Sequence, residues 1–400
     1  MPASFLYIAQ GRIFLKEPDQ PAKPIESVFA QTLVDRTQQI RQRNAWKVQG
    51  FGARFMSGGM PWNSDPGEDQ AEVPVVINAV SRGTHDGEIL YSLASGEIGG
   101  LFSIEHTGQN ERRILHTADF RISELNASTT EGKIACVIRT KAGSHIAIMR
   151  SDGGELSDVT QGDALDASPV WAPGAPHELI FQSAGIARNA AGAAVGVSAS
   201  QIMKVSIESG DTEVLLGDEQ HDYLDPKMDA AGNLYCVRKP HDSLTPAFNP
   251  FRAIWDLILL PVRLLFAVFQ FMNFFTMRYT GKTLVSSGNM RQRQMDPRQM
   301  LIMDNVAHAR GASALFAPNR KDWKVSRSWT LVKKAPNGAL ESIAPGVLTF
   351  RSLRGWVSSI YKWKPYYTNG SRIFTRTPDG QTQEVLKEQF ISQVLAFPAK

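Results

Sequence analysis

Short runs in which apolar and polar residues alternate recur along most of this chain, and glycine-containing turns separate them. "KIACVIR" (133–139) and "HIAIMRS" (145–151) show the alternation, with "TKAG" between them and "SDGG" after them. A period of two is typical of a half-buried β-strand, and such turns connect hairpins. The same unit returns at residues 5–30, 88–116 and 365–388. The pattern predicts an all-β protein built from a repeated sheet of four short strands.

The first copy of the unit lacks an opening strand, and the chain ends with a spare one, "FISQVLAF" (Phe390–Phe397). A ring of sheets explains both, because the last strand then completes the first sheet beside Phe5–Ala9. We therefore predict a six-bladed β-propeller closed by the N- and C-terminal strands, with an inserted amphipathic and hydrophobic helical segment. The predicted blades are Val75–Thr117, Ala118–Gln161, Gly162–Asp218, Glu219–Gly346, Val347–Glu388, and Phe390–Phe397 together with Phe5–Ala30.

One stretch resembles a known family. "SPVWAPGAPHELIFQSAG" looks like the Pro-x-Trp-Ser-Pro-Asp-Gly motif of TolB-type, WD-repeat-like six-bladed propellers. The matching residues are Pro169, Trp171, Pro173 and Phe181, and "DPKMDAAGNLYCV" is a weaker copy with Pro226 and Gly232. The resemblance implies the propeller fold. It does not imply a function, because propellers include enzymes and scaffolds alike.

Two segments interrupt the repeat and set the predicted organisation. The segment 31–72 reads as a polar helix followed by a loop rich in glycine and proline. It is either a surface decoration or a partner-binding arm, and the arm would expose Phe55, Met56, Met60 and Trp62. The predicted regions are terminal strands at 1–30, this insertion at 31–72, blades at 73–240, a second insertion at 241–327, and further blades with the closing strand at 328–400.

The second insertion contains "FNPFRAIWDLILLPVRLLFAVFQFMNFF", in which 17 of the 22 residues from Ile254 to Phe275 are apolar. On a helical projection Arg252, Asp256, Arg263 and Gln270 form one narrow polar stripe, and Pro261 is expected to kink the helix. We predict an amphipathic helix that lies in a membrane interface. The expected membrane contacts are Phe251, Ile254, Trp255, Ile258, Leu264, Leu265, Val268, Phe269, Met272 and Phe275.

A single membrane crossing would separate two halves of one blade, so only an even number of crossings, or none, is compatible with a closed ring. Charge supports the membrane interpretation. Residues Arg278 to Lys334 contain 12 Lys and Arg against 3 Asp and Glu. The expected contacts to an anionic surface are Arg278, Lys282, Arg291, Arg293 and Arg298. Two other possibilities stay open: the helix packs against another protein or a second copy, or it folds back onto its own propeller.

Composition adds little to this picture. With 42% hydrophobic and 20% charged residues, the chain has the composition of a globular protein. Its two cysteines, Cys136 and Cys236, lie in similar strand contexts and are expected to be buried thiols. The N-terminal sequence does not match a signal peptide, which favours the cytosolic side of a membrane. A basic segment could also attract nucleic acid, but the aromatic residues of this insertion form an unbroken apolar run and do not alternate with Arg and Lys, which disfavours that partner.

The sequence contains no phosphate-binding loop, dinucleotide fingerprint or nucleophile elbow, and we predict no cofactor and no zinc site. "GDALDASP" and "EQHDYLDP" place acidic residues just before two predicted inner strands. These residues are expected near the mouth of the central channel, as a ligand or cation site or as ordinary turn residues. The candidates are Asp166, His221, Asp222 and Asp225.

The favoured function is a non-enzymatic propeller that binds partner proteins at the cytosolic face of a membrane. The alternative is a hydrolase or lyase that uses the channel-mouth residues.

Overall fold

The computed structural model describes residues 3–48, 75–241, 325–352 and 365–398, apart from positions 86, 96–97, 141–142, 191, 193 and 378–379 in turns. The chain divides into two compact units. One unit holds all the described strands and comprises Met1–Gln39, Glu72–Asp242 and Asp296–Lys400. The other comprises Ile40–Ala71 and Ser243–Met295, of which only the last part of one helix is described. The rest of this section concerns the first unit.

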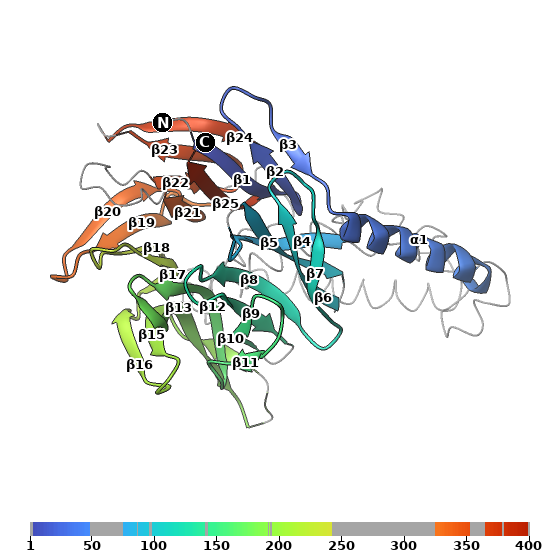
Figure 1. Ribbon diagram of the computed structural model, residues 1–400. Helices are drawn as coiled ribbons and strands as arrows, with labels where there is room; N and C mark the ends of the chain where they lie inside the picture. The colour runs from blue at the N-terminus through green and yellow to red at the C-terminus, as the bar shows by residue number, and fades with distance from the viewer. Residues whose placement is uncertain are drawn as a thin grey trace, which may run out of the picture. The chain divides into compact units, whose positions relative to one another are not determined.

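The strands form antiparallel sheets in which chain neighbours are sheet neighbours (Figure 1). One sheet contains β4 (Val75–Arg82), β5 (Glu88–Ser95), β6 (Ile98–Glu105) and β7 (Arg112–Thr117). A second contains β17 (His221–Met228), β18 (Leu234–Pro240), β19 (Thr330–Lys334) and β20 (Leu340–Pro345). A third contains β21 (Thr349–Ser352), β22 (Pro365–Thr368), β23 (Arg372–Arg376) and β24 (Thr382–Lys387). The predicted repeat of four short strands is therefore confirmed in these three sheets.

A larger sheet of nine strands combines two such groups. The first group is β8 (Arg121–Ala127), β9 (Lys133–Arg139), β10 (Ser144–Arg150) and β11 (Ser157–Asp158). The second is β12 (Ala164–Ala172), β13 (Ala175–Arg188), β14 (Ala194–Val197), β15 (Gln201–Ser206) and β16 (Thr212–Leu216). The two groups are joined by one parallel bridge, between Ser144 and Leu165.

The two ends of the chain share a sheet, as predicted. Its order is β25 (Ile391–Pro398), β1 (Ala3–Ala9), β2 (Arg12–Lys16) and β3 (Lys23–Ile25). β1 and β25 pair antiparallel from Ala3 opposite Pro398 to Ala9 opposite Ile391, and the ends marked N and C lie side by side in Figure 1. The expected pairing of Phe390–Phe397 with Phe5–Ala9 is thus confirmed at the level of this strand pair.

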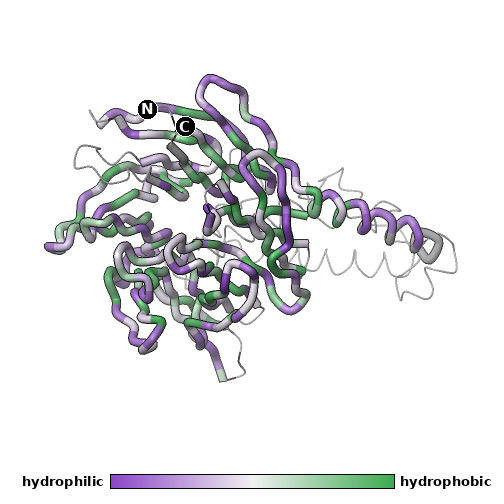
Figure 2. The backbone as a smooth tube through the Cα atoms, viewed as in Figure 1, coloured by the Kyte–Doolittle hydropathy of each residue, from purple (hydrophilic) through white to green (hydrophobic). Residues whose placement is uncertain are grey.

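Several strands, such as β5 and β9, are buried on both faces, and their apolar residues (Figure 2) pack between sheets that follow one another in the chain. One buried cluster joins Ala79 and Leu90 of the β4–β7 sheet to Ile122 and Ile134 of β8 and β9. Corresponding clusters join β9 and β10 to β12 and β13, β13 to β17 and β18, and β18 and β19 to β21 and β22. Two more join the sheet of β1 and β25 to its neighbours on either side. The core thus lies between sheets that pack face to face.

Both cysteines lie in this core, as expected. Cys136 in β9 and Cys236 in β18 are fully buried free thiols. Burial raises the pKa of Cys136 to about 12, with a smaller contribution from the nearby Asp158 charge. A thiol that stays protonated is an unreactive packing residue.

Basic side chains on the third strand of two sheets reach across to the outermost strand of the preceding sheet. The Lys334 Nζ atom in β19 donates to the Leu215 carbonyl in β16 at 2.5 Å. Arg376 in β23 donates to the Ile343 carbonyl in β20. Each bond satisfies a carbonyl on a strand that would otherwise present an open edge.

The helix α1 (Val28–Val48) is the predicted polar helix, and it begins three residues before Gln31. Its start follows from capping. The Ser27 Oγ atom accepts from the Ala30 amide at 2.9 Å, and Glu111 Oε2 accepts from the amides of Val28 and Phe29 at 2.9 and 3.2 Å. The first turn contains no acidic residue, so Glu111 from the β6–β7 turn supplies the negative charge that favours a helix N-terminus.

Candidate functional site

Two inner strands are interrupted at equivalent points. β12 has a bulge between Ala167 and Val170, and β17 has one between Leu224 and Lys227. Within the bulges Ser168 has φ 54° and Asp225 has φ 53°. Each precedes a proline, and a left-handed conformation is disfavoured for a non-glycine residue. Surrounding contacts must therefore hold both residues in place.

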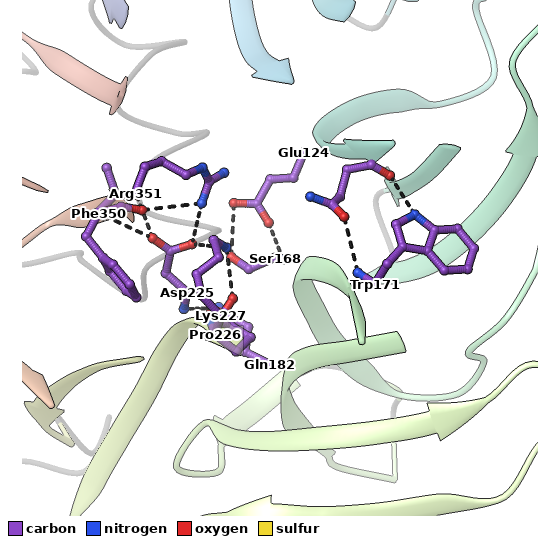
Figure 3. A network of polar contacts seen from close by, with 11 residues as sticks. Glu124, Ser168, Trp171, Gln182, Asp225, Pro226, Lys227, Phe350 and Arg351 are labelled. Atoms are coloured by element: carbon purple, nitrogen blue, oxygen red, sulfur yellow. Dashed lines mark hydrogen bonds and ion pairs between the residues drawn. The ribbon is translucent and has the colours of Figure 1, made fainter. Parts of the chain in front are cut away.

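The bulges release two backbone amides, which bind side chains of other strands (Figure 3). The Ser168 amide donates to Glu124 Oε2, and the Ser168 hydroxyl lies 3.3 Å from Glu124 Oε1. The Asp225 amide donates to Gln182 Oε1 at 2.8 Å. Glu124 is in β8 and Gln182 is in β13, so each bond connects successive groups of strands. The same arrangement thus occurs at two junctions.

The Asp225 carboxylate is the centre of the polar network in Figure 3. The side chain is 1% exposed. Its Oδ1 atom lies 2.8 Å from Lys227 Nζ and 3.5 Å from Arg351 Nη1. Its Oδ2 atom accepts from the Thr349 hydroxyl at 2.6 Å and from the Phe350 amide at 3.3 Å. A buried carboxylate is tolerated only with partners of this kind, and here they join β17 to β21.

The residues behind the family resemblance are structural. The Trp171 side chain is 7% exposed, and its Nε1 atom donates to the Asn126 carbonyl at 3.0 Å. The Trp171 amide donates to the Asn126 side chain at 3.2 Å (Figure 3). Phe181 is buried in the same hydrophobic cluster. Pro169 follows the bulge residue Ser168. This motif therefore fastens β12 to β8 and does not form a reactive group.

Asp222 belongs to a second buried charge cluster, which we call the Asp222 cluster: Asp222, Lys239, His241 and Trp329. Asp222 Oδ2 lies 2.7 Å from Lys239 Nζ, and Oδ1 lies 2.8 Å from His241 Nδ1. Oδ1 also accepts from the Ser200 amide at 2.8 Å. Lys239 is 2% exposed, and its Nζ atom lies 5.5 Å from the centre of the Trp329 ring. That distance is in the range of a cation–π contact.

His221 is partly exposed and binds Asp218 instead of Asp222. Its Nδ1 atom lies 3.0 and 3.1 Å from the two Asp218 carboxylate oxygens. The Tyr223 hydroxyl donates to Asp218 at 2.7 Å. Burial alone would raise the pKa of Asp218, but the hydrogen bonds from Tyr223, Gln220 and His221 lower it to about 2. Asp218 therefore remains a carboxylate at any physiological pH.

Asp166 differs from the other candidates. It is 3% exposed, and its Oδ1 atom has no hydrogen-bond partner among the described residues. Burial raises the pKa of the Asp166 carboxyl, and interactions with Ser183, Thr160 and His145 oppose this only in part. The positional equivalent of Asp225 is Ser168, so Asp166 lies two residues before the bulge. A buried oxygen without a donor marks a place for a proton, a water or a ligand.

The structure places the four predicted channel-mouth residues in separate groups. Asp225 lies in the bulge network, Asp222 in the cluster with Lys239, His221 beside Asp218, and Asp166 at the β12–β13 pair. In the described ranges no three His, Cys, Asp or Glu side chains are placed to hold a metal ion together. Two of the three carboxylates are neutralised by cations of the protein itself.

The residues predicted to contact a membrane lie in a different part of the chain. Residues 251–298, which include all the expected membrane and anionic-surface contacts, lie outside the described residues. The same holds for Phe55, Met56, Met60 and Trp62. Of the helical residues that are described, none form a helix long and apolar enough to traverse a bilayer.

Sequence reasoning missed Glu124, Gln182, Thr349 and Arg351, which complete the network around the bulges. Glu124 and Gln182 lie 44 and 43 positions from their partners, and Thr349 lies 124 positions from Asp225. Arg351, two residues after Thr349, contacts the same Asp225 carboxylate. Local sequence patterns do not indicate which residues pair over such separations. The one available signal was the pair of X-Pro steps at Pro169 and Pro226, because proline inside a strand indicates a bulge.

Comparison with known proteins supports the fold. No protein-family model matches the sequence, and no curated protein is matched either. Among solved structures, TolB from Acinetobacter baumannii superposes with a TM-score of 0.50 at 9% identity, over 99% of this chain and 66% of that chain. A chain of a nidogen/laminin complex gives a TM-score of 0.49 at 10% identity, over 98% of both chains. The tricorn protease gives 0.41 at 9% identity, over 98% of this chain and 34% of that one.

At such low identity the likeness to TolB bears on architecture alone. It agrees with the sheets of successive antiparallel strands, with the cores between them, and with the resemblance noted at Pro169 and Trp171. The WD-repeat part of that resemblance stays a prediction. The fold of this chain is that of a β-propeller.

Proposed function

We propose that this β-propeller has six blades closed by the terminal strands, and that it is a non-enzymatic scaffold binding a partner protein at the cytosolic face of a membrane. The sequence of buried clusters supports the closed ring. Taken in chain order, they connect each group of strands to the next, and the group containing β22 and β23 to the sheet of β1 and β25. In a ring of six blades the nine-stranded sheet forms two blades, which are joined by the single parallel bridge between Ser144 and Leu165.

Several polar bonds between successive groups of strands follow the same order. They connect β25 to β4 through Gln393 and the Val80 amide at 2.8 Å, and β17 to β21 through Asp225 and Thr349. Glu124 and Gln182 supply the bonds between β8 and β12 and between β13 and β17. Such bonds favour a rigid ring whose outer loops are free to bind.

The observation that carries the scaffold proposal is the state of the inner carboxylates. Asp222 and Asp225 are each bound by a lysine of the chain, at 2.7 and 2.8 Å. A carboxylate held in this way is poorly placed to act as a general base or to bind a metal ion. It fixes strands instead. This favours a structural and binding role for the centre of the propeller over a reaction.

The membrane part of the proposal rests on the sequence of residues 242–324 and on the place from which they extend. β18 and β19 are antiparallel neighbours, and Arg238 lies opposite Thr330. The intervening segment therefore leaves and returns at the same end of two adjacent strands. That arrangement suits a segment that lies in one membrane interface.

Vesicle sedimentation tests this proposal. The full chain is mixed with vesicles of phosphatidylcholine containing ~30% phosphatidylserine, and with phosphatidylcholine alone. We expect binding to the anionic vesicles, weakened when Arg278, Lys282, Arg291, Arg293 and Arg298 are changed to Gln and abolished when 243–298 are deleted. Equal binding by the deletion variant would refute the membrane role. A partner captured by both the full chain and the deletion variant would assign the protein contact to the propeller itself.

One observation favours the alternative of a ligand-binding enzyme, a hydrolase or lyase. The buried Asp166 Oδ1 atom lacks a donor among the described residues, and the pKa of this carboxyl is raised. A raised pKa is common for a general acid. A thermal-shift screen with divalent cations and small metabolites would reveal such a site as a rise in Tm that Asp166→Ala removes. A screen without any such rise would end this alternative.

A further inference from the structure

The Asp222 cluster lies at the base of the 242–324 segment. Lys239 and His241 are among the last residues described before the segment, and Trp329 comes just after it. Asp222 on the neighbouring β17 contacts both Lys239 and His241. Through the Lys239 side chain, one buried carboxylate is thus linked to both ends of the segment.

Backbone bonds hold the same two ends. The His241 amide donates to the Gln220 carbonyl at 2.8 Å. On the returning side, the Val325 amide donates to the Asn369 carbonyl at 3.1 Å, and the Trp329 carbonyl accepts from the amides of Gly346 and Val347 at 2.6 and 3.0 Å. Val325 and Trp329 are also buried in the hydrophobic cluster of β18 and β19. β18 and β19 are adjacent strands, and their pairing ends with Arg238 opposite Thr330, so the chain leaves and re-enters the sheet on neighbouring strands.

An ordinary surface loop does not require buried charged residues at the strands from which it extends. Burying a lysine and an aspartate is unfavourable unless the pair is well arranged, and an apolar replacement is often at least as stable. In several proteins a buried polar or ionic group fixes one arrangement against alternatives. Here the alternatives are different positions of the two ends relative to the sheet.

We propose that Asp222, Lys239, His241 and Trp329 form a clamp that locks the two ends of the 242–324 segment together against β17. The clamp holds β18 and the start of β19 in one arrangement where the chain leaves and re-enters the sheet, and it does not rest on the function proposed above.

Hydrogen–deuterium exchange on the full chain tests the clamp without any membrane. Asp222→Asn removes the shared anion, and Lys239→Met removes the cation but keeps most of its length, so that a folded variant is available if the first one fails to fold. We expect exchange at 236–241 and at 326–331 to rise together by about tenfold or more. Exchange in β23 and β24 should stay unchanged. The matched control is Asp229→Asn, which changes a carboxylate at the opposite end of the same hairpin, where Asp229 accepts from the amides of Ala231 and Asn233.

Faster exchange confined to the substituted strand, or no change in either segment, would overturn the clamp. The same result in the Asp229→Asn control would also overturn it, since the loosening would then not depend on the cluster. The vesicle experiment is separate. A chain that shows coupled exchange but binds no vesicles keeps the clamp and loses the membrane role, whereas a chain that binds vesicles without coupled exchange loses the clamp alone.

Discussion

The Thr349 hydroxyl donates a 2.6 Å hydrogen bond to the buried Asp225 carboxylate, although the two residues are 124 positions apart in the chain. Asp225 sits in a strained bulge of β17, and Thr349 begins β21. The bond therefore links a strained residue on one sheet to the first strand of the next. It gives the junction a specific geometry that apolar packing alone would not impose.

Asp225→Asn should destabilise the protein strongly. The substitution leaves Lys227 and Arg351 without their buried anion, and removing one partner of a buried ion pair typically costs about 3–5 kcal/mol. The free energy of unfolding from urea titration measures the loss. The control is Asp152→Asn, whose carboxylate pairs with Arg150 in an exposed turn and should leave the midpoint unchanged. Equal midpoints for the two variants would show that the bulge network contributes little.

Asp166→Asn should stabilise the protein at neutral pH. The folded pKa of this carboxyl is raised above its ordinary value of 3.8, so folding favours the neutral form. The contribution of the neutral carboxyl to the free energy of unfolding is fully present below pH 3.8 and is lost as pH rises through the folded pKa. An amide stays neutral throughout. The difference in Tm between variant and parent should therefore be near zero at pH 3.5 and grow toward pH 7. A difference independent of pH would contradict this explanation.

Glu111→Gln should loosen the start of α1. The neutral amide keeps an acceptor oxygen for the amides of Val28 and Phe29 but loses the favourable charge at the helix N-terminus, an effect of about 0.3–1 kcal/mol. Exchange of the amides at 28–34 should rise, while β5 stays protected. Glu105→Gln in the same turn region is the control, because the Glu105 carboxylate accepts hydrogen bonds from Thr107 and Asn110 and, in the described part of the chain, from no amide of α1. Unchanged exchange at 28–34 would exclude Glu111 as the cap.

The pairing of β1 with β25 predicts that the chain tolerates circular permutation. Ala3 lies opposite Pro398, so a linker of about four residues can join them as a hairpin turn. New ends between Ser209 and Gly210 fall in the exposed β15–β16 turn. We expect this permutant to keep the parent's cooperative unfolding, measured by thermal denaturation. Removing 391–398 should abolish it, since β25 carries buried Val394 and Ala396. A truncated chain that still unfolds cooperatively would show that β25 is not needed for the fold.

The strands and the shared terminal sheet were predictable because each depends on local signals. Residues 133–150 show two alternating runs and a turn, and β9 and β10 fall on them. The unpaired run at Phe390–Phe397 needed a partner, and β1 is that partner. The resemblance at Pro169 and Trp171 indicated a propeller, and the likeness to TolB agrees.

The arrangement of the candidate site could not be predicted in the same way. The sequence predicts Asp166, Asp222 and Asp225 just before two inner strands, whereas they lie within β12 and β17. Which carboxylate contacts a cation depends on pairing that the local pattern does not give: Lys239 lies opposite Asp222 in the β17–β18 hairpin, and Arg351 reaches Asp225 from a distant strand. The equivalence of Ser168 and Asp225 is set by bulge register, which one residue can shift. Glu111 as a helix cap depends on a turn that is 83 positions from Val28.

The pairing of β1 with β25 also determines when the terminal sheet can form during protein synthesis. Roughly 380 residues are translated between the two strands, which takes ~20–80 s at usual ribosome speeds. For all that time β1 has β2 on one side and an open edge on the other. The nascent chain must therefore shield that edge, through its own later sheets or through a chaperone, until its final strand emerges.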